Sequence, residues 1–231
     1  MAKIVSKPEH NVYSNIDDGP LMAPVIGANV DGKPNFMVGA YLGRIDNNPD
    51  NYHYKVAVRI HKDRYTLKGI RQTQGFSVNI LNPAMEHLIE NGFAGGTGAK
   101  VDKVARTGIK VFYGKMGNVP MVMESPVNYE CSVLHTLDCG THILIVGIVQ
   151  EIHVEESCIE NGKLRWNKVQ PLYRLHINHL DDNYAPRTDT REYVAFKLCD
   201  EDSKKTDVLE VSFQSKKYYW QKRLETDRTR Q

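Results

Sequence analysis

The sequence predicts a mainly β protein: an antiparallel β-barrel with a few short helices packed outside it. Segments with an alternating or fully apolar pattern recur along the chain, at residues 25–30, 36–42, 55–60, 76–81, 127–134 and 142–154. Turn-forming residues separate these segments, whereas helical patterns are few and short. A barrel is favoured because closing the strands on one another removes exposed sheet edges.

The first two strands, 25–30 and 36–42, flank the turn residues 31–35 and predict a β-hairpin. Strands 55–60 and 76–81 each place apolar side chains on one face, and Ser77 and Asn79 fall on the opposite, polar face. A short helix opening at Thr66 lies between these two strands.

Asn82 and Pro83 predict a second helix, as its N-cap and first residue, and Gly92 ends it. Asn161-Gly162 predicts a tight hairpin turn within residues 157–164, and a short strand follows at 172–175.

Composition limits the function classes. The net charge of the 231 residues is +2, which gives no general case for a nucleic-acid partner. The longest apolar run, residues 143–149, is too short to span a bilayer, and the first eleven residues lack the apolar core of a signal peptide. We therefore expect a cytoplasmic protein. Its four cysteines form no Cys-x-x-Cys pair, so free, buried thiols are expected rather than disulfides.

The segment His61-Lys62-Asp63-Arg64, here called the cationic turn, joins strand 55–60 to the helix that opens at Thr66. Free backbone N–H groups and the helix dipole make a helix N-terminus fed by a basic loop a favourable anion site. The alternative is an ordinary solvated turn.

Residues 94–100, here called the glycine loop, have the sequence Ala-Gly-Gly-Thr-Gly-Ala-Lys. The loop lacks the Lys-Ser/Thr of a P-loop and the third glycine of a dinucleotide fingerprint, so neither is supported. The alternative interpretation is a flexible loop. No Ser-His-Asp pattern is present. His176 and His179 lack a visible third ligand, so no metal site is predicted.

Three stretches carry a resemblance to a known family. They are 61–80 (HKDRYTLKGIRQTQGFSVNI), 96–103 (GTGAKVDK) and 121–131 (MVMESPVNYEC), with residues 28–35 as a first hairpin. In this order the chain resembles the flavin reductase-like, FMN-binding split-barrel family, which includes the flavoredoxins. The resemblance covers residues 20 to 175 and implies a Greek-key antiparallel split barrel.

The resemblance implies FMN as cofactor, with its phosphate at the cationic turn and its ring beside the first hairpin. The candidate cofactor-binding residues are Asn35, Phe36, Met37, Val38, His61, Lys62, Arg64, Tyr65, Thr66, Asn79, Thr97, Lys100 and Lys103. For Asp102 and Lys103, a simple helix-terminus pair is the alternative. No catalytic side chain is assigned, because the flavin itself carries the chemistry.

The implied function is an oxidoreductase that passes electrons from NAD(P)H or a reduced redox protein to free flavin, ferric iron or another protein. A homodimer is expected, with neither nucleic acid nor membrane as partner. The alternatives are a non-catalytic FMN-carrying shuttle, or a split barrel that has lost flavin and binds another ligand. An oligonucleotide-binding barrel would need a basic, aromatic-lined face, which the near-neutral composition does not favour.

The domain expectation is a flavin reductase-like split barrel at 1–180 and a C-terminal extension at 181–231. A polar linker, 181–186, opens the extension. Two alternating segments then predict a β-hairpin whose apolar face consists of Val194, Phe196, Leu198, Leu209, Val211 and Phe213. A basic tail follows.

Overall fold

The computed structural model describes residues 21–39, 41–46, 54–94, 96–180, 186–197 and 210–212. The strands are β1 (Leu21–Met22), β2 (Val25–Val30), β3 (Lys33–Val38), β4 (Leu42–Asp46), β5 (Lys55–His61), β6 (Gly75–Ile80), β7 (Val111–Tyr113), β8 (Pro120–Val122), β9 (Val127–Cys139), β10 (His142–Val154), β11 (Ile159–Glu160), β12 (Lys163–Leu164), β13 (Leu172–Leu180), β14 (Pro186–Lys197) and β15 (Glu210–Ser212). The helices are α1 (Tyr65–Thr73), η3 (Pro83–Met85), α2 (Glu86–Leu88), η4 (Ile89–Phe93), α3 (Lys103–Thr107), η5 (Glu156–Cys158) and α4 (Trp166–Val169).

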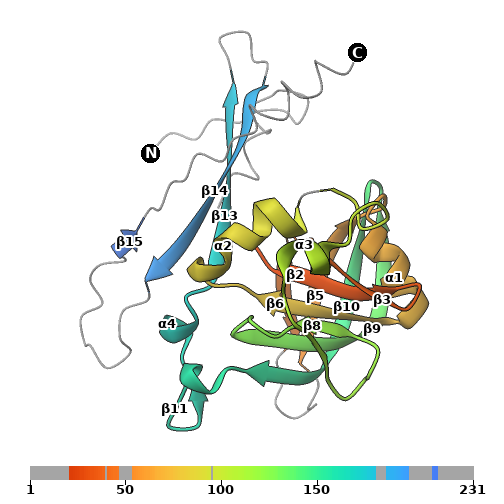
Figure 1. The fold of residues 1–231 in the computed structure, drawn as a ribbon, viewed down its shortest axis with the longest axis horizontal. Coiled ribbons are helices and arrows are strands. Elements are labelled where there is room, and N and C mark those ends of the chain that lie inside the picture. Colours follow the sequence, from red (N-terminus) through yellow and green to blue (C-terminus); the bar gives the residue numbers. More distant parts are fainter. Residues whose placement is uncertain are drawn as a thin grey trace, which may run out of the picture.

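Seven antiparallel strands form the main sheet, in the order β3-β2-β6-β9-β10-β5-β4. The edge strands β3 and β4 follow each other along the chain, separated only by residues 39–41. Four Cα–Cα steps span at most about 15 Å, so the two edges of the sheet lie close together. The sheet therefore curls into a barrel that is split between β3 and β4. Figure 1 shows the curled sheet with α1 and the short helices outside it. The predicted mainly β, antiparallel split barrel is confirmed.

One core cluster fills the barrel. It joins apolar side chains of β2, β5, β6, β9 and β10 to Leu67 and Ile70 of α1. These two helical residues are three apart and lie on one face of α1. Burial of each large apolar side chain contributes about 1.5–3 kcal/mol, so the packing fixes α1, and with it the cationic turn, against the barrel.

A second cluster lies on the other side of β2 and β3, where helical residues 83–93 pack. Phe36 of β3 and Phe93 of η4 are fully buried there, with ring centroids 5.9 Å apart. Because both faces of β2 are covered, its residues Val25 to Ala28 are all buried. This explains the unbroken apolar run in the sequence.

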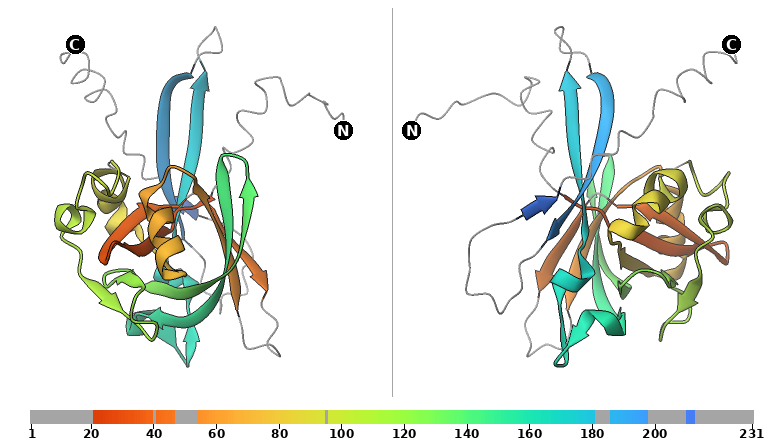
Figure 2. Two further views of the ribbon diagram at one scale, coloured as in Figure 1. Left: turned by 90° about the vertical axis from the view of Figure 1, so that its right-hand side faces the viewer. Right: turned by 60° about the vertical axis from the view of Figure 1, so that its left-hand side comes forward.

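A separate four-stranded sheet has the order β1-β13-β14-β15. Its long β13–β14 ribbon extends away from the barrel (Figures 1 and 2). The predicted pairing of the two C-terminal segments is present, since Phe196 lies opposite Val211 in β14–β15. Residues 181–185 of the predicted linker, and also Leu198, Leu209 and Phe213, lie outside the described residues.

Several predicted boundaries are wrong. The strand expected at 36–42 ends at Val38, and Leu42 begins β4, which pairs with β5 instead. The helical segment begins as predicted, with Asn82 as N-cap and Pro83 as its first residue, although Asn82 makes no side-chain capping bond. Its predicted end is wrong, because it continues through Gly92 to Phe93. The strand expected to end at residue 175 continues to Leu180, because β14 pairs with it along that length.

The expected polar face of β6 is also wrong. Ser77 and Asn79 are fully buried, because β8 covers that face and Ser77 Oγ donates a 2.6 Å hydrogen bond to the Pro120 carbonyl. Of the three described cysteines, all free thiols, Cys131 and Cys158 are buried as expected but Cys139 is exposed. In the described part of the chain, no helix has the length and apolarity needed to cross a membrane.

Candidate flavin site

The N-terminus of α1 has the properties of an anion site. Arg64 is the N-cap, with an extended backbone and no capping side-chain bond, and the first turn holds no acidic residue. The N–H groups of Tyr65 and Thr66 lie in that turn, where a helix offers them no carbonyl partner. The helix dipole adds partial positive charge at the same place. An open hollow of about 450 Å³ beside the helix is lined by Arg64, Tyr65 and Lys68, among others.

The basic residues of the cationic turn have different surroundings. Lys62 Nζ lies 2.7 Å from a carboxylate oxygen of Asp138, and this contact holds the pKa of Asp138 below its ordinary value. His61 Nδ1 accepts a 3.2 Å hydrogen bond from the Asp63 N–H. Within the described residues no carboxylate pairs with Arg64, so Arg64 is the turn's available cation.

Lys103 adds a second cation near Arg64. Its side chain is 6% exposed, and Nζ donates a 2.6 Å hydrogen bond to the Phe93 carbonyl. Burial, and then the positive charges of Arg64 and Arg106, lower its pKa from 10.5 to about 8. Asp102 caps α3 by accepting a 2.9 Å bond from the Ala105 N–H, which agrees with the alternative helix-terminus interpretation for Asp102.

Asn35 ties the first hairpin to this helix start. Asn35 is buried, and Nδ2 donates a 2.7 Å hydrogen bond to Thr66 Oγ1. The glycine loop lies directly on these residues, since a Cβ at Gly98 would overlap Asn35 Oδ1 and lie 3.0 Å from a ring carbon of Tyr65. Only a glycine permits this approach.

The other candidate residues of the glycine loop and first hairpin do not take part in the contacts around Asn35 and Thr66. Thr97 and Lys100 are exposed, and they are joined by a 3.0 Å bond between the Lys100 N–H and the Thr97 carbonyl. Phe36 points into the second core cluster, and Met37 and Val38 pack partly buried against the two clusters. Because β3 is an edge strand, its outward backbone groups, rather than these side chains, are open to a ligand.

Asn79 is separate from this group. It is fully buried, and Nδ2 donates to the Val25 carbonyl at 2.8 Å and to Ser77 Oγ at 3.0 Å. Oδ1 accepts from the Val122 N–H at 2.9 Å and from Asn128 Nδ2 at 2.8 Å. All four hydrogen-bonding positions of the amide are filled within the protein. In this structure Asn79 joins β2, β6, β8 and β9.

Sequence reasoning missed one group. Glu130, Glu151 and His153 bring their ligand atoms within 4.8 Å of one another. Glu130 lies in residues 121–131, one of the stretches that resemble the family. Its distance along the sequence from residues 151 and 153 gives no sign that the three side chains lie together.

A family model described as "flavin reductase like domain" matches residues 22–173. The chain belongs to the flavin reductase-like family. The matched residues contain the whole seven-stranded sheet, the cationic turn and the glycine loop. Family membership supports flavin binding and a flavin-related oxidoreductase function.

Known proteins agree with this assignment. An uncharacterized protein of Pyrococcus abyssi is 31% identical over 110 residues, which cover 48% of this chain and 62% of that protein. The chain thus spans less than two thirds of that relative's length. The crystal structure of flavoredoxin from Methanosarcina acetivorans superposes with a TM-score of 0.68 at 28% identity, covering 89% of this chain and 97% of that one.

A more distant structure shares the fold. An FMN-binding protein from Thermus thermophilus superposes with a TM-score of 0.57 at 22% identity, covering 71% of this chain and 86% of the other.

Proposed function

We propose that this protein binds FMN and transfers electrons as a flavin reductase or flavoredoxin. The observation that carries the proposal is the pair of cations, Arg64 and Lys103, beside the N-terminus of α1. Neither has a carboxylate partner in the described residues, and the positive charge of Arg64, after burial, helps to lower the pKa of Lys103. An anion between them relieves that repulsion, and a phosphate accepts hydrogen bonds from both and from first-turn N–H groups.

The surrounding residues suit the rest of the cofactor. The outward edge of β3 offers backbone N–H and C=O groups that a flat heteroaromatic ring can meet with its own donors and acceptors. The contact between Gly98 and Asn35 brings the glycine loop against that strand, which supports Thr97 and Lys100 as further ligand contacts in this proposal. His61, Lys62 and Tyr65 line the phosphate end. The FMN-binding protein of similar fold supports FMN as the flavin.

A bound flavin supplies the two-electron chemistry. The chain holds the phosphate with fixed charges, orders the ring through β3 and shields part of it with the glycine loop. We propose NAD(P)H or a reduced protein as donor, and free flavin, ferric iron or another protein as acceptor. We also propose a cytoplasmic homodimer in which residues 1–180 form the flavin domain and 181–231 an extension.

Absorption spectroscopy is the first test. We expect a purified preparation, or apo-protein reconstituted with FMN, to be yellow and to show the visible absorption bands of a flavin. A colourless protein that does not take up FMN contradicts the proposal and favours a barrel that binds another ligand. Anaerobic addition of NADH or NADPH then separates two functions. Bleaching identifies a reductase, whereas a flavin reduced only by a protein partner identifies a shuttle.

A further inference from the structure

A β-bulge in β10 changes which side of the sheet its last residues face. Val149 lies opposite Cys131 of β9, but Glu151 lies opposite Glu130, so Gln150 is an extra residue in the ladder. In a regular strand, with Gln150 paired in the ladder, Glu151 and His153 would share the face of Val149, which packs in the barrel core. The bulge instead turns both side chains to the face of Glu130. Bulges that re-aim side chains are over-represented beside functional sites.

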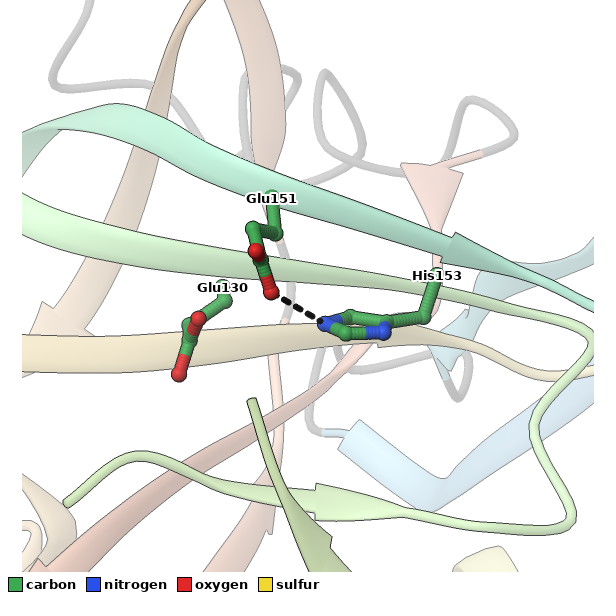
Figure 3. A group of neighbouring side chains, drawn as sticks. All are labelled: Glu130, Glu151 and His153. Carbon is green, nitrogen blue, oxygen red and sulfur yellow. Dashed lines mark ion pairs between the residues drawn. The ribbon is translucent and has the colours of Figure 1, made fainter. Parts of the chain in front are cut away.

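Figure 3 shows the Glu151 carboxylate and the His153 imidazole turned toward each other, with Glu130 beside them. His153 Nε2 lies 3.4 Å from Glu151 Oε2, and the ligand atoms of all three residues lie within 4.8 Å of one another. Two ligands held about 2.0–2.2 Å from a tetrahedral metal ion are roughly 3.3–3.6 Å apart, which the His153–Glu151 contact already matches.

Glu130 and His153 each have a buried atom without a hydrogen-bond partner, and Glu130 is the more deeply buried of the two. It is fully buried, and its Oε1 accepts a 3.1 Å hydrogen bond from the Met116 N–H. The other oxygen, Oε2, has no hydrogen-bond partner. A buried carboxylate oxygen without a partner is unfavourable, because burial removes its water and nothing replaces it. The oxygen needs a proton or a cation.

The turn between β7 and β8 closes over this group. A Cβ at Gly114 would lie 2.7 Å from Glu130 Oε2 and 2.8 Å from His153 Nε2, so a side chain there would occupy the space between them. The Lys115 N–H donates a 3.2 Å bond to Glu151 Oε2. The ring of Phe112 meets the His153 imidazole edge to face, with centroids 5.2 Å apart. These contacts orient the ligands from a second layer, as metal sites require.

We propose that Glu130, Glu151 and His153 bind a divalent first-row transition-metal ion of the Zn²⁺ class. One imidazole nitrogen and two carboxylates form a donor set for such an ion, whereas Mg²⁺ and Ca²⁺ prefer oxygen ligands alone. The ion gives Glu130 Oε2 its missing partner and joins β9 to β10 beneath the β7–β8 turn. The proposal does not depend on flavin, because none of the three residues belongs to the candidate flavin site.

Calorimetric titration with Zn²⁺ tests the site. Untagged full-length protein, treated with chelator and dialysed, is titrated alongside His153→Gln and Glu151→Gln. Loss of even an outer-layer partner commonly weakens metal binding about 10- to 100-fold. Each of these variants loses a direct ligand, so we expect at least about 100-fold weaker binding at one site per chain. His135→Gln is the matched control, since His135 is an exposed histidine of β9 that lies outside the group.

The outcomes are separable. One Zn²⁺ site lost in His153→Gln and Glu151→Gln but kept in His135→Gln supports the proposal. An unchanged isotherm in His153→Gln, or no binding by the wild-type chain, overturns it and leaves a proton shared by the carboxyl groups as the partner of Oε2. Circular dichroism and flavin absorbance of each variant show whether it is folded. Glu130→Gln is used only as a third variant, because its side chain is buried.

Discussion

The amide of Asn35 in β3 donates a 2.7 Å hydrogen bond to Thr66 Oγ1 in the first turn of α1. This bond joins the edge strand of the barrel to the helix start where an anion is expected. Both residues are buried, so the bond is shielded from water. Because the Thr66 hydroxyl accepts from Asn35, its own hydrogen stays available to another acceptor. The strand edge and the helix start therefore form one rigid unit.

The first prediction concerns the phosphate. Changing Arg64 to Ala together with Thr66 to Val should weaken FMN binding by about 3 kcal/mol or more, roughly 150-fold, because two donors to the phosphate are lost. Titration of apo-protein followed by flavin fluorescence measures the effect. Arg44→Ala is the matched control, since Arg44 is an exposed arginine of β4 that does not line the hollow beside α1. If the double variant binds FMN with unchanged affinity, the phosphate does not bind at the N-terminus of α1.

The second prediction concerns the form of the flavin. The wild-type site should bind FMN more tightly than riboflavin, because riboflavin has no phosphate for Arg64 and the first turn of α1 to hold. The preference should shrink in Arg64→Ala, since that variant loses one charge-assisted bond, about 1.5–3 kcal/mol. Dissociation constants for both ligands measure it. Equal constants in the wild-type protein mean that the cationic turn has another role.

The third prediction is a pH dependence through Lys103. Its pKa of about 8 lies below the ordinary 10.5, so the free protein loses this charge as pH rises through 8. The FMN phosphate favours the charged form. Above pH 8 binding must therefore take up a proton, and FMN affinity should fall by up to about tenfold per pH unit. The folding stability of the ligand-free protein should change in the opposite direction. Between pH 8 and 10.5 Lys103 keeps its proton in the unfolded chain but has lost it in the folded one, so the free energy of unfolding rises with pH.

The test compares the FMN dissociation constant between pH 7 and 9.5 in the wild-type protein and in Lys103→Met. The variant keeps an apolar stem of similar length but cannot titrate at this position. We expect its curve to lack the fall above pH 8. Parallel curves for the two proteins would assign the pH dependence to another group.

The fourth prediction concerns Asn79. Replacement by Ala leaves the Val122 N–H without its acceptor and takes from Asn128 Nδ2 one of its two acceptors, the other being the Val122 carbonyl. Each unsatisfied buried group costs about 1–3 kcal/mol, so we expect a loss of about 3 kcal/mol in the free energy of unfolding. FMN affinity of the folded fraction should stay within about twofold, a change below 0.5 kcal/mol. Urea denaturation and FMN titration measure the two effects.

Gln150→Ala is the control for Asn79→Ala. Gln150 is an exposed amide with a 2.8 Å bond to Ser132 Oγ, and a surface change of this kind stays within about 0.5 kcal/mol. If Asn79→Ala instead abolishes FMN binding while stability is kept, the asparagine contacts the flavin as the family resemblance implied.

The fifth prediction concerns the C-terminal extension. Truncation after Tyr184 removes β14, the partner of β13 along Leu172 to Leu180. We expect a lower melting temperature or loss of the proposed homodimer, because β13 loses its ladder and a two-stranded ribbon is marginal without further packing. The seven-stranded barrel lies wholly before the cut, so FMN binding should persist at least in part. Scanning calorimetry, light scattering and FMN titration report these three properties. Native values in all three show the extension to be dispensable.

Local sequence chemistry was enough for much of the fold. The apolar runs and turn residues predicted β2, β5, β6, β9 and β10. These predictions succeed because the alternation of a strand and the residue types of its turns depend only on residues that are neighbours in the sequence. The same signals failed at residues 36–42. That run is continuous in hydrophobicity, but its two ends pair with opposite edges of the sheet, and strand pairing is a long-range property.

The sequence by itself determined the antiparallel β class, the family resemblance and the helix start at the cationic turn, because these depend on residues close together in the chain. Only the tertiary structure decided which polar residues act where. It buried Asn79 beneath β8, placed Lys103 beside Arg64, and used one extra residue, Gln150, to bring Glu151 and His153 to Glu130. A one-residue change of register reverses the face of every side chain that follows, so such sites are set by strand pairing and not by spacing along the chain.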